Sequence, residues 1–89
     1  MAKTIEFSGE HVWQPKRDSM SFEVVVDGKK TRCLISKEAL EDHYGADQLK
    51  KVEQAFEDNQ FEIENVARNM INKGQVDNSG EYLIRSQDV

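Results

Sequence analysis

Cys33 and His43 come closest to a catalytic pair in this chain, a thiol nucleophile with an imidazole base. A reactive cysteine needs solvent access and a nearby positive charge or helix N-terminus, either of which lowers the pKa of its thiol. Cys33 lies in an alternating segment that points it inward, where a free cysteine usually behaves as a small apolar residue. A helix expected after Ser36 lies close by. The alternative of a small enzyme or small-molecule binder, with a cleft near Trp13, Cys33 and His43, therefore stays open.

Metal-ligand patterns are weak. A structural zinc normally requires four histidine or cysteine ligands, and the chain has two histidines and one cysteine. The segment Asp77–Gly80 superficially resembles a calcium loop. Aligning Gly80 with the invariant glycine of such loops places Gln75 and Ser86 where ligands, including a bidentate glutamate, are required. We expect no metal, no cofactor and no catalytic residues.

Phosphate and nucleic-acid sites are also disfavoured. Gly28-Lys29 would fit a phosphate loop only with a glycine five residues earlier, where Glu23 stands, and with a helix rather than a strand following. The densest basic group, Lys29–Arg32, sits where a hairpin tip is expected and is interpreted as a solvated turn. The net charge is −5. Nucleic-acid binders concentrate positive charge on one surface, so we expect no nucleic-acid partner.

The length of 89 residues favours a single domain over residues 1–89. Apolar residues make up 37% of the chain and charged residues 33%, which describes a polar but foldable domain. No apolar run approaches the roughly 20 residues of a membrane helix, and the N-terminus lacks the core of a signal peptide. A single cysteine gives no sign of an oxidising compartment. These features predict a cytoplasmic protein with no membrane partner.

Alternating apolar residues predict the strands. Thr4–Phe7 reads as a short first strand, and Met20–Val26 as a second that places Phe22 and Val24 on one face. Asp27-Gly28 is a strong hairpin signal, and the return strand runs from about residue 30 to 35. Either plausible register keeps Cys33 on the Phe22 face. A final strand is expected within residues 81–86.

Helical periodicity occupies the region between. Ser36 is a candidate N-cap for a short helix that ends near Gly45. From Gln48 to Lys73 the apolar residues form one helical stripe, but Phe61 projects away from it. Either the helix breaks between residues 57 and 60, or Phe61 is exposed. Asn59 followed by Glu62 resembles an N-cap with its capping-box partner, which favours a break.

The element order is therefore β-β-β-α-α-β, with the long helical region split if the break is real. This order predicts an α+β fold in which a small antiparallel sheet carries its helices on one face.

The chain also resembles a bacterial family known as domain of unknown function 1488. The similarity extends over nearly the whole chain and is carried by Phe7, Trp13, Met20, Phe22, Asp27-Gly28, Cys33-Leu34-Ile35-Ser36, Glu38-Ala39-Leu40 and Gly45. Phe56, Ile63 and Ala67 fit as well. Met20 departs from the valine expected there, a swap that a core tolerates. The resemblance implies the fold and no function, because the family supplies no catalytic residues.

A surface for another protein is the leading functional hypothesis. With helices on only one sheet face, Val25 and Leu34 should form an exposed apolar patch with residues of the last strand. Phe61 is a second candidate contact. Trp13 is interpreted as a lid on the core. We therefore expect a non-catalytic protein-binding or self-associating domain, with a homodimer or another protein as partner.

Overall fold

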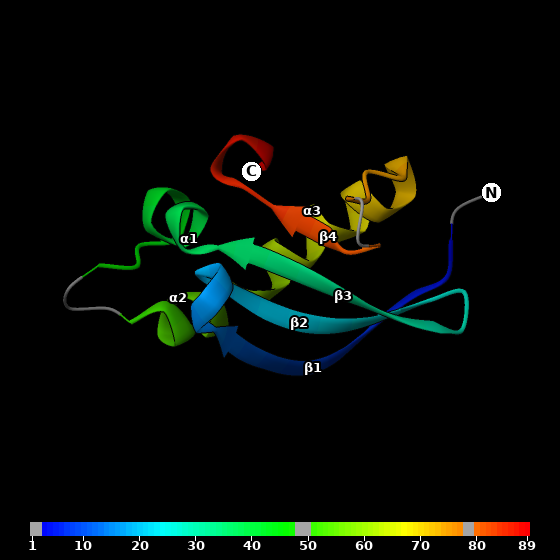
Figure 1. The fold of residues 1–89 in the computed structure, drawn as a ribbon, viewed down its shortest axis with the longest axis horizontal. Helices are drawn as coiled ribbons and strands as arrows, with labels where there is room; N and C mark the ends of the chain where they lie inside the picture. Colours follow the sequence, from blue (N-terminus) through cyan, green and yellow to red (C-terminus); the bar gives the residue numbers. More distant parts are fainter. Residues whose placement is uncertain (1–2, 48–50, 78–79) are drawn as a thin grey trace.

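A computed structural model describes residues 3–47, 51–77 and 80–89, and these residues form an α+β fold around a four-stranded sheet (Figure 1). The strands follow chain order across the sheet, β1-β2-β3-β4. Their bounds are β1 Ile5–Gln14, β2 Ser19–Val26, β3 Lys29–Ser36 and β4 Tyr82–Ile84. Short 3-10 turns, η1 Pro15–Arg17 and η2 Ser86–Asp88, follow β1 and β4.

The β2–β3 hairpin confirms the predicted turn and facing. Val26 pairs with Lys29, so Asp27 and Gly28 alone make the turn. Both have positive φ, 52° and 83°, the combination that matches the twist of a tight hairpin and that glycine adopts without steric cost. Phe22 pairs with Cys33, and both are buried on the same face.

The first strand is longer than its alternation predicts. Alternation predicts a strand over Thr4–Phe7, whereas β1 extends from Ile5 to Gln14. Its pairing with β2 shifts between Phe7 and His11, where an irregularity inserts extra residues. Gly9, with φ of 87°, lies in this polar stretch. The bulge interrupts the alternation, which explains why the second half of β1 escaped prediction.

The fourth strand pairs differently from the others. β1, β2 and β3 are antiparallel, as predicted, whereas β4 lies parallel to β3. The three helices separate β3 from β4 along the chain, and such a crossover lets the last strand run in the same direction as β3. Tyr82 and Ile84 join the core, and Leu83 points to the other sheet face.

Three helices pack on one face of the sheet and build the core with it. They are α1 Lys37–His43, α2 Val52–Asp58 and α3 Gln60–Lys73. Ser36 caps α1 as predicted, its hydroxyl accepting the Ala39 N–H at 3.1 Å. Fully buried residues of all three helices, including Leu40, Phe56 and Ile63, join Phe22 and Cys33 in one cluster. No helix in the described part of the chain is long and apolar enough to cross a membrane.

The predicted helix break is confirmed, but its mechanism differs. α2 ends at Asp58 and α3 begins at Gln60, with Asn59 between them. The Asn59 side chain makes no N-cap bond. Its amide instead donates to the backbone oxygens of Ala55 at 3.0 Å and Tyr44 at 3.3 Å. The predicted start of this helical region, positions 48–50, lies outside the described residues.

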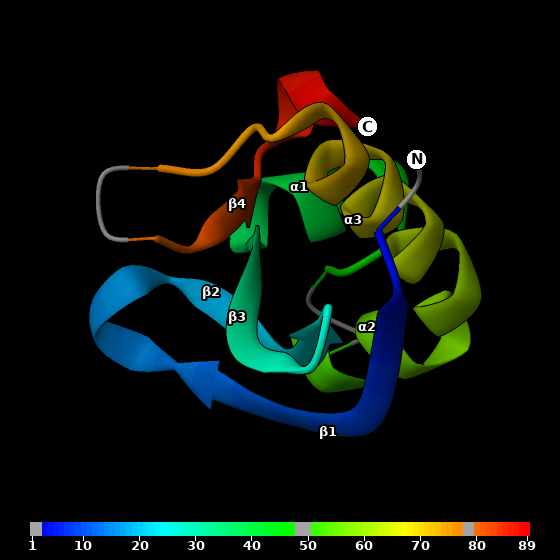
Figure 2. The same ribbon diagram turned by 90° about the vertical axis from the view of Figure 1, so that its right-hand side faces the viewer.

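The face opposite the helices, called here the helix-free face, carries Ser21, Glu23 and Arg32. Leu34 lies on it but has 0% exposure, so the expectation that Leu34 is an exposed contact is wrong. Figure 2 shows that the β1–β2 end of the sheet curls toward β4. Arg17, at that curled end, donates to Glu81 just before β4.

Candidate functional site

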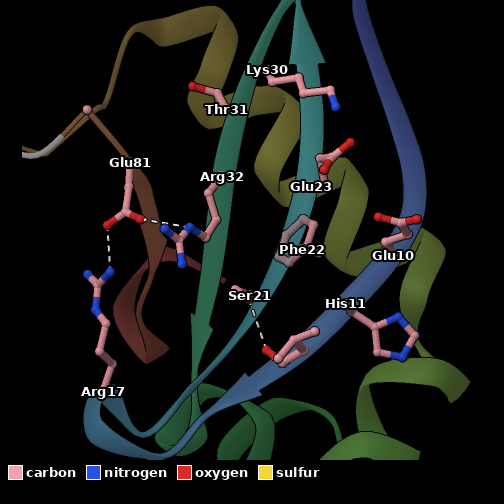
Figure 3. A pocket seen from close by; sticks show the side chains of 12 residues that line it. Glu10, His11, Arg17, Ser21, Phe22, Glu23, Lys30, Thr31, Arg32 and Glu81 are labelled. Atoms are coloured by element: carbon pink, nitrogen blue, oxygen red, sulfur yellow. Dashed lines mark hydrogen bonds and ion pairs between the residues drawn. The ribbon is translucent and has the colours of Figure 1, made fainter.

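The helix-free face is hollowed into an open groove of about 700 Å³ (Figure 3). Residues of β1, η1, β2 and β3 line it, together with Gly80 and Glu81 just before β4. Its lining is mostly polar or charged: Glu10, His11, Val12, Arg17, Ser21, Phe22, Glu23, Lys30, Thr31, Arg32, Gly80 and Glu81. Such a lining differs from the mainly apolar wall of most small-molecule sites.

An ion-pair bridge spans one side of the groove. A guanidinium nitrogen of Arg17 lies 2.5 Å from Glu81 Oε1, and Arg32 Nε lies 3.0 Å from Glu81 Oε2 (Figure 3). The carboxylate is largely buried between two arginines that are 40% and 52% exposed. Exposed pairs of this kind add little stability, but two cations around one carboxylate leave an excess of positive charge.

The buried hydroxyl of Ser21 in the groove has hydrogen-bond partners for both its donor and its acceptor. Ser21, only 6% exposed, donates its hydroxyl to the Val12 carbonyl at 3.0 Å and accepts from the Gln14 amide at 3.1 Å. Both bonds fix the β1–β2 wall. Because its proton is already bonded to a carbonyl, Ser21 is not set up as a nucleophile.

Charge divides the groove lengthwise. Glu10 and Glu23 stand on the β1–β2 side, and neither carboxylate has an ionic partner among the described residues. Arg32 on β3 and Arg17 on η1 stand against the single carboxylate of Glu81, while Lys30 on β3 extends its side chain toward β2 (Figure 3). Acidic groups from β1 and β2 therefore lie beside cationic groups from β3 and η1 on one surface.

The chain matches one family model and a solved structure of the same family. The family model described as "Protein of unknown function (DUF1488)" matches residues 5–84, nearly the whole chain. The chain belongs to this family. A crystal structure of a DUF1488 protein of unknown function from Shewanella loihica PV-4 superposes with a TM-score of 0.82 at 26% identity, covering 94% of each chain. No match is found among curated proteins.

In this DUF1488 chain Cys33 is a core residue. It has 0% exposure, and burial raises the pKa of its thiol to about 12. A thiol so hard to ionise is a poor nucleophile at neutral pH. The N-cap of α1 lies near in sequence, yet it does not offset the cost of burying a thiolate.

His43 and Trp13 do not join Cys33 in a cleft. Trp13 is partly buried and packs against the core, as the lid interpretation predicts. His43 is exposed at the end of α1, and its Nε2 lies 2.9 Å from the Ser86 backbone oxygen. None of the three lines the groove.

An unforeseen Ser-His-Asp cluster surrounds that histidine. Ser86 Oγ lies 2.5 Å from Asp42 Oδ2 and 3.3 Å from His43 Nε2. A backbone carbonyl only accepts, so the bond to Ser86 O requires the proton on His43 Nε2. The imidazole cannot then accept the serine proton, and the hydroxyl instead donates to Asp42. The cluster ties η2 to α1 and lacks the geometry of a catalytic triad.

The three residues predicted to form contacts differ in their exposure to solvent. Leu34 is buried, Val25 is partly buried on the helix-free face, and Phe61 is 84% exposed at the start of α3. They do not form one patch.

The residues that sequence reasoning missed are Arg17 and Glu81, which lie 64 positions apart and give no local signal of their pairing. Within the described residues, no group of three or more His, Cys, Asp or Glu is placed to hold a metal.

Proposed function

We propose that this DUF1488 protein is a non-catalytic protein-binding domain that self-associates through its helix-free face. The observation that carries the proposal is the division of the groove into an acidic strip, Glu10 and Glu23, and a cationic strip, Arg17, Lys30 and Arg32. Complementary charge at an interface steers association and selects the partner.

A two-fold axis makes this face complementary to itself. When a second copy faces the first across an axis parallel to the strands, the rotation exchanges the two sides of the groove. The cationic strip of each copy then lies over the acidic strip of the other. This local match offsets the repulsion between two chains that each carry a net charge of −5.

Apolar contacts supplement the charges. Val12 is 60% exposed on the groove wall, and Val25 and Leu83 are partly buried on the same face. An interface with such residues among a charged rim resembles ordinary protein contacts more than a substrate pocket. The chemistry of the chain supports the non-catalytic part of the proposal, because Cys33 is buried and His43 is turned to a backbone carbonyl.

Charge exchange between two variants tests the proposal. Glu10→Lys with Glu23→Lys makes the groove mainly cationic, and Lys30→Glu with Arg32→Glu makes it mainly acidic. We expect the unmodified chain to sediment as a dimer, twice its 10.3 kDa, at high micromolar concentration. Each double variant should sediment as a monomer, and an equimolar mixture of the two should recover the dimer mass.

Recovery in the mixture separates loss of contact from loss of fold, since misfolded chains would not pair. Lys51→Glu, an exposed charge change outside the groove, is the matched control and should leave the dimer intact. An unmodified protein that stays at 10.3 kDa would rule out the self-association.

A further inference from the structure

Among the residues that the structure describes, Phe61 is the most exposed large apolar side chain, ahead of Val12, Val76 and Val89. It has 84% exposure, whereas Phe56, five residues earlier, has 0%. Burying a phenylalanine side chain is worth roughly 1.5–3 kcal/mol, and this ring leaves that free energy unused in the isolated chain. A ring in this position is available to a partner.

The backbone beneath the ring is held in place. Asn59 bonds to the carbonyls of Ala55 and Tyr44, and its own carbonyl accepts the Ile63 N–H at 3.0 Å. These bonds set the angle at which α3 leaves α2, and so fix where residue 61 projects. An anchor positioned before binding loses less conformational entropy when a partner arrives.

The surroundings of the ring are acidic. A hollow of about 380 Å³ at the α2–α3 junction is lined by Glu57, Asp58, Asn59, Gln60, Phe61 and Glu62. It contains three carboxylates and no lysine or arginine. His11 lies 3.1 Å from Glu57, and Gln54 donates to Asp58 at 2.7 Å, which orients two of the carboxylates. We call Glu57, Asp58, Phe61 and Glu62 the acidic corner.

Charge decides which partner suits this surface. A second copy presenting its own acidic corner would place like charges together around the two rings, and such a contact is repulsive. The corner lies at the α2–α3 junction, whereas the groove opens on the helix-free face, and the two adjoin at His11, which lines the groove and lies 3.1 Å from Glu57. Phe61 and Glu62 do not line the groove, so a dimer formed through the groove would not need to cover the ring.

We propose that the acidic corner docks a basic segment of a different protein. An apolar side chain of that segment would pack on Phe61, while its lysine or arginine side chains would reach Glu57, Asp58 and Glu62. The aromatic contact supplies the anchor, and the carboxylates select for positive charge.

Titration of the isotope-labelled full chain with short peptides tests this docking by nuclear magnetic resonance. The probe is an eight-residue peptide of alternating leucine and lysine. One comparison peptide replaces lysine by glutamate, and another replaces leucine by serine. We expect the leucine–lysine peptide to shift the amide signals of residues 57–62, and both comparison peptides to bind far more weakly. Added salt should weaken the binding, because the contact is partly ionic.

Variants assign the binding to the corner. Phe61→Ser should weaken it about tenfold, as loss of an anchor residue does. Asp58→Asn with Glu62→Gln should weaken it and reduce its salt dependence. Val76→Ser, which truncates another exposed apolar residue, is the control and should change nothing.

Three results would overturn the proposal: no shift at low millimolar peptide, equal binding of the leucine–glutamate peptide, or unchanged affinity in Phe61→Ser. Shifts confined to the groove residues would also count against the corner. The Phe61 ring is exposed, so its replacement should leave the fold and the dimer mass intact. Failure here is therefore distinguishable from failure of self-association.

Discussion

At the scale of single residues, burial decides chemistry. Cys33 sits on the core face of β3 with 0% exposure, and its thiol pKa is raised to about 12 because burial penalises the thiolate. The thiol is therefore neutral in the folded protein at physiological pH. Native Cys33 should react with a thiol reagent only as fast as the chain unfolds.

The same shift predicts how stability depends on alkaline pH. The unfolded thiol ionises near its ordinary pKa of 9.0, while the folded thiol holds its proton to about 12. Between those values the folded state binds more protons, so the free energy of unfolding falls as pH rises. The slope from one such group is at most about 1.4 kcal/mol per pH unit.

Cys33→Ala should lower stability at neutral pH through the lost sulfur, yet flatten the decline above pH 9.0, the ordinary pKa of the thiol. Chemical denaturation at several pH values measures both effects. Equal alkaline slopes in the variant and the unmodified chain would contradict the assignment. Tyr44, whose pKa is also raised by burial and by Glu62, remains in both proteins and cancels from the comparison.

At the scale of elements, local patterns predicted more than distant ones. The hairpin at Asp27-Gly28 and the Ser36 cap follow from residues a few positions apart, and both are confirmed. The helix break followed from one misfit, Phe61, but its cause did not. Asn59 bonds to Tyr44, 15 positions away, and no local motif reports such a contact.

We therefore expect Asn59 to stabilise the α2–α3 junction through the hydrogen bonds that its side-chain amide donates to backbone oxygens. An N-cap residue acts in the opposite sense, because its side chain accepts a hydrogen bond. Asn59→Ala and Asn59→Asp both remove the donor, and each should cost about 1–2 kcal/mol of unfolding free energy. An N-cap role would instead let aspartate substitute without loss. Asn69→Ala, at an exposed position within α3, is the control and should be neutral or slightly stabilising. Wild-type stability in Asn59→Asp would restore the N-cap interpretation.

At the scale of the whole molecule, the sequence predicted the layers but not the curvature. Alternation assigns each side chain to a face, and so it placed Leu34 opposite the core correctly. It does not report how far a hairpin curls. The Arg17–Glu81 pair joins the curled end to the segment before β4 across 64 positions, and both residues line the groove. The full burial of Leu34 is likewise a property of the folded sheet that alternation does not report. The parallel direction of β4 likewise depends on the helical crossover, which no single segment encodes.

Phe56 and Phe61 lie five positions apart, one in the core and the other on the surface. Phe56 has 0% exposure, with its ring centroid 5.3 Å from that of Phe22 and 4.8 Å from that of His11. Phe56→Ala should cost about 3–5 kcal/mol, because it removes apolar contacts from all sides and leaves a cavity. That loss is a large share of the roughly 5–15 kcal/mol that stabilises a typical domain.

Phe61→Ala deletes the same atoms from water-exposed space. Its unfolding free energy should stay within about 0.5 kcal/mol of the unmodified value. Alanine's higher helix propensity should offset part of any loss. Urea denaturation of the two variants gives the comparison directly, since the chemical change is identical and only the surroundings differ. A Phe61 cost comparable to that of Phe56 would mean that the ring packs against the fold in solution, and the acidic corner would then lack its anchor.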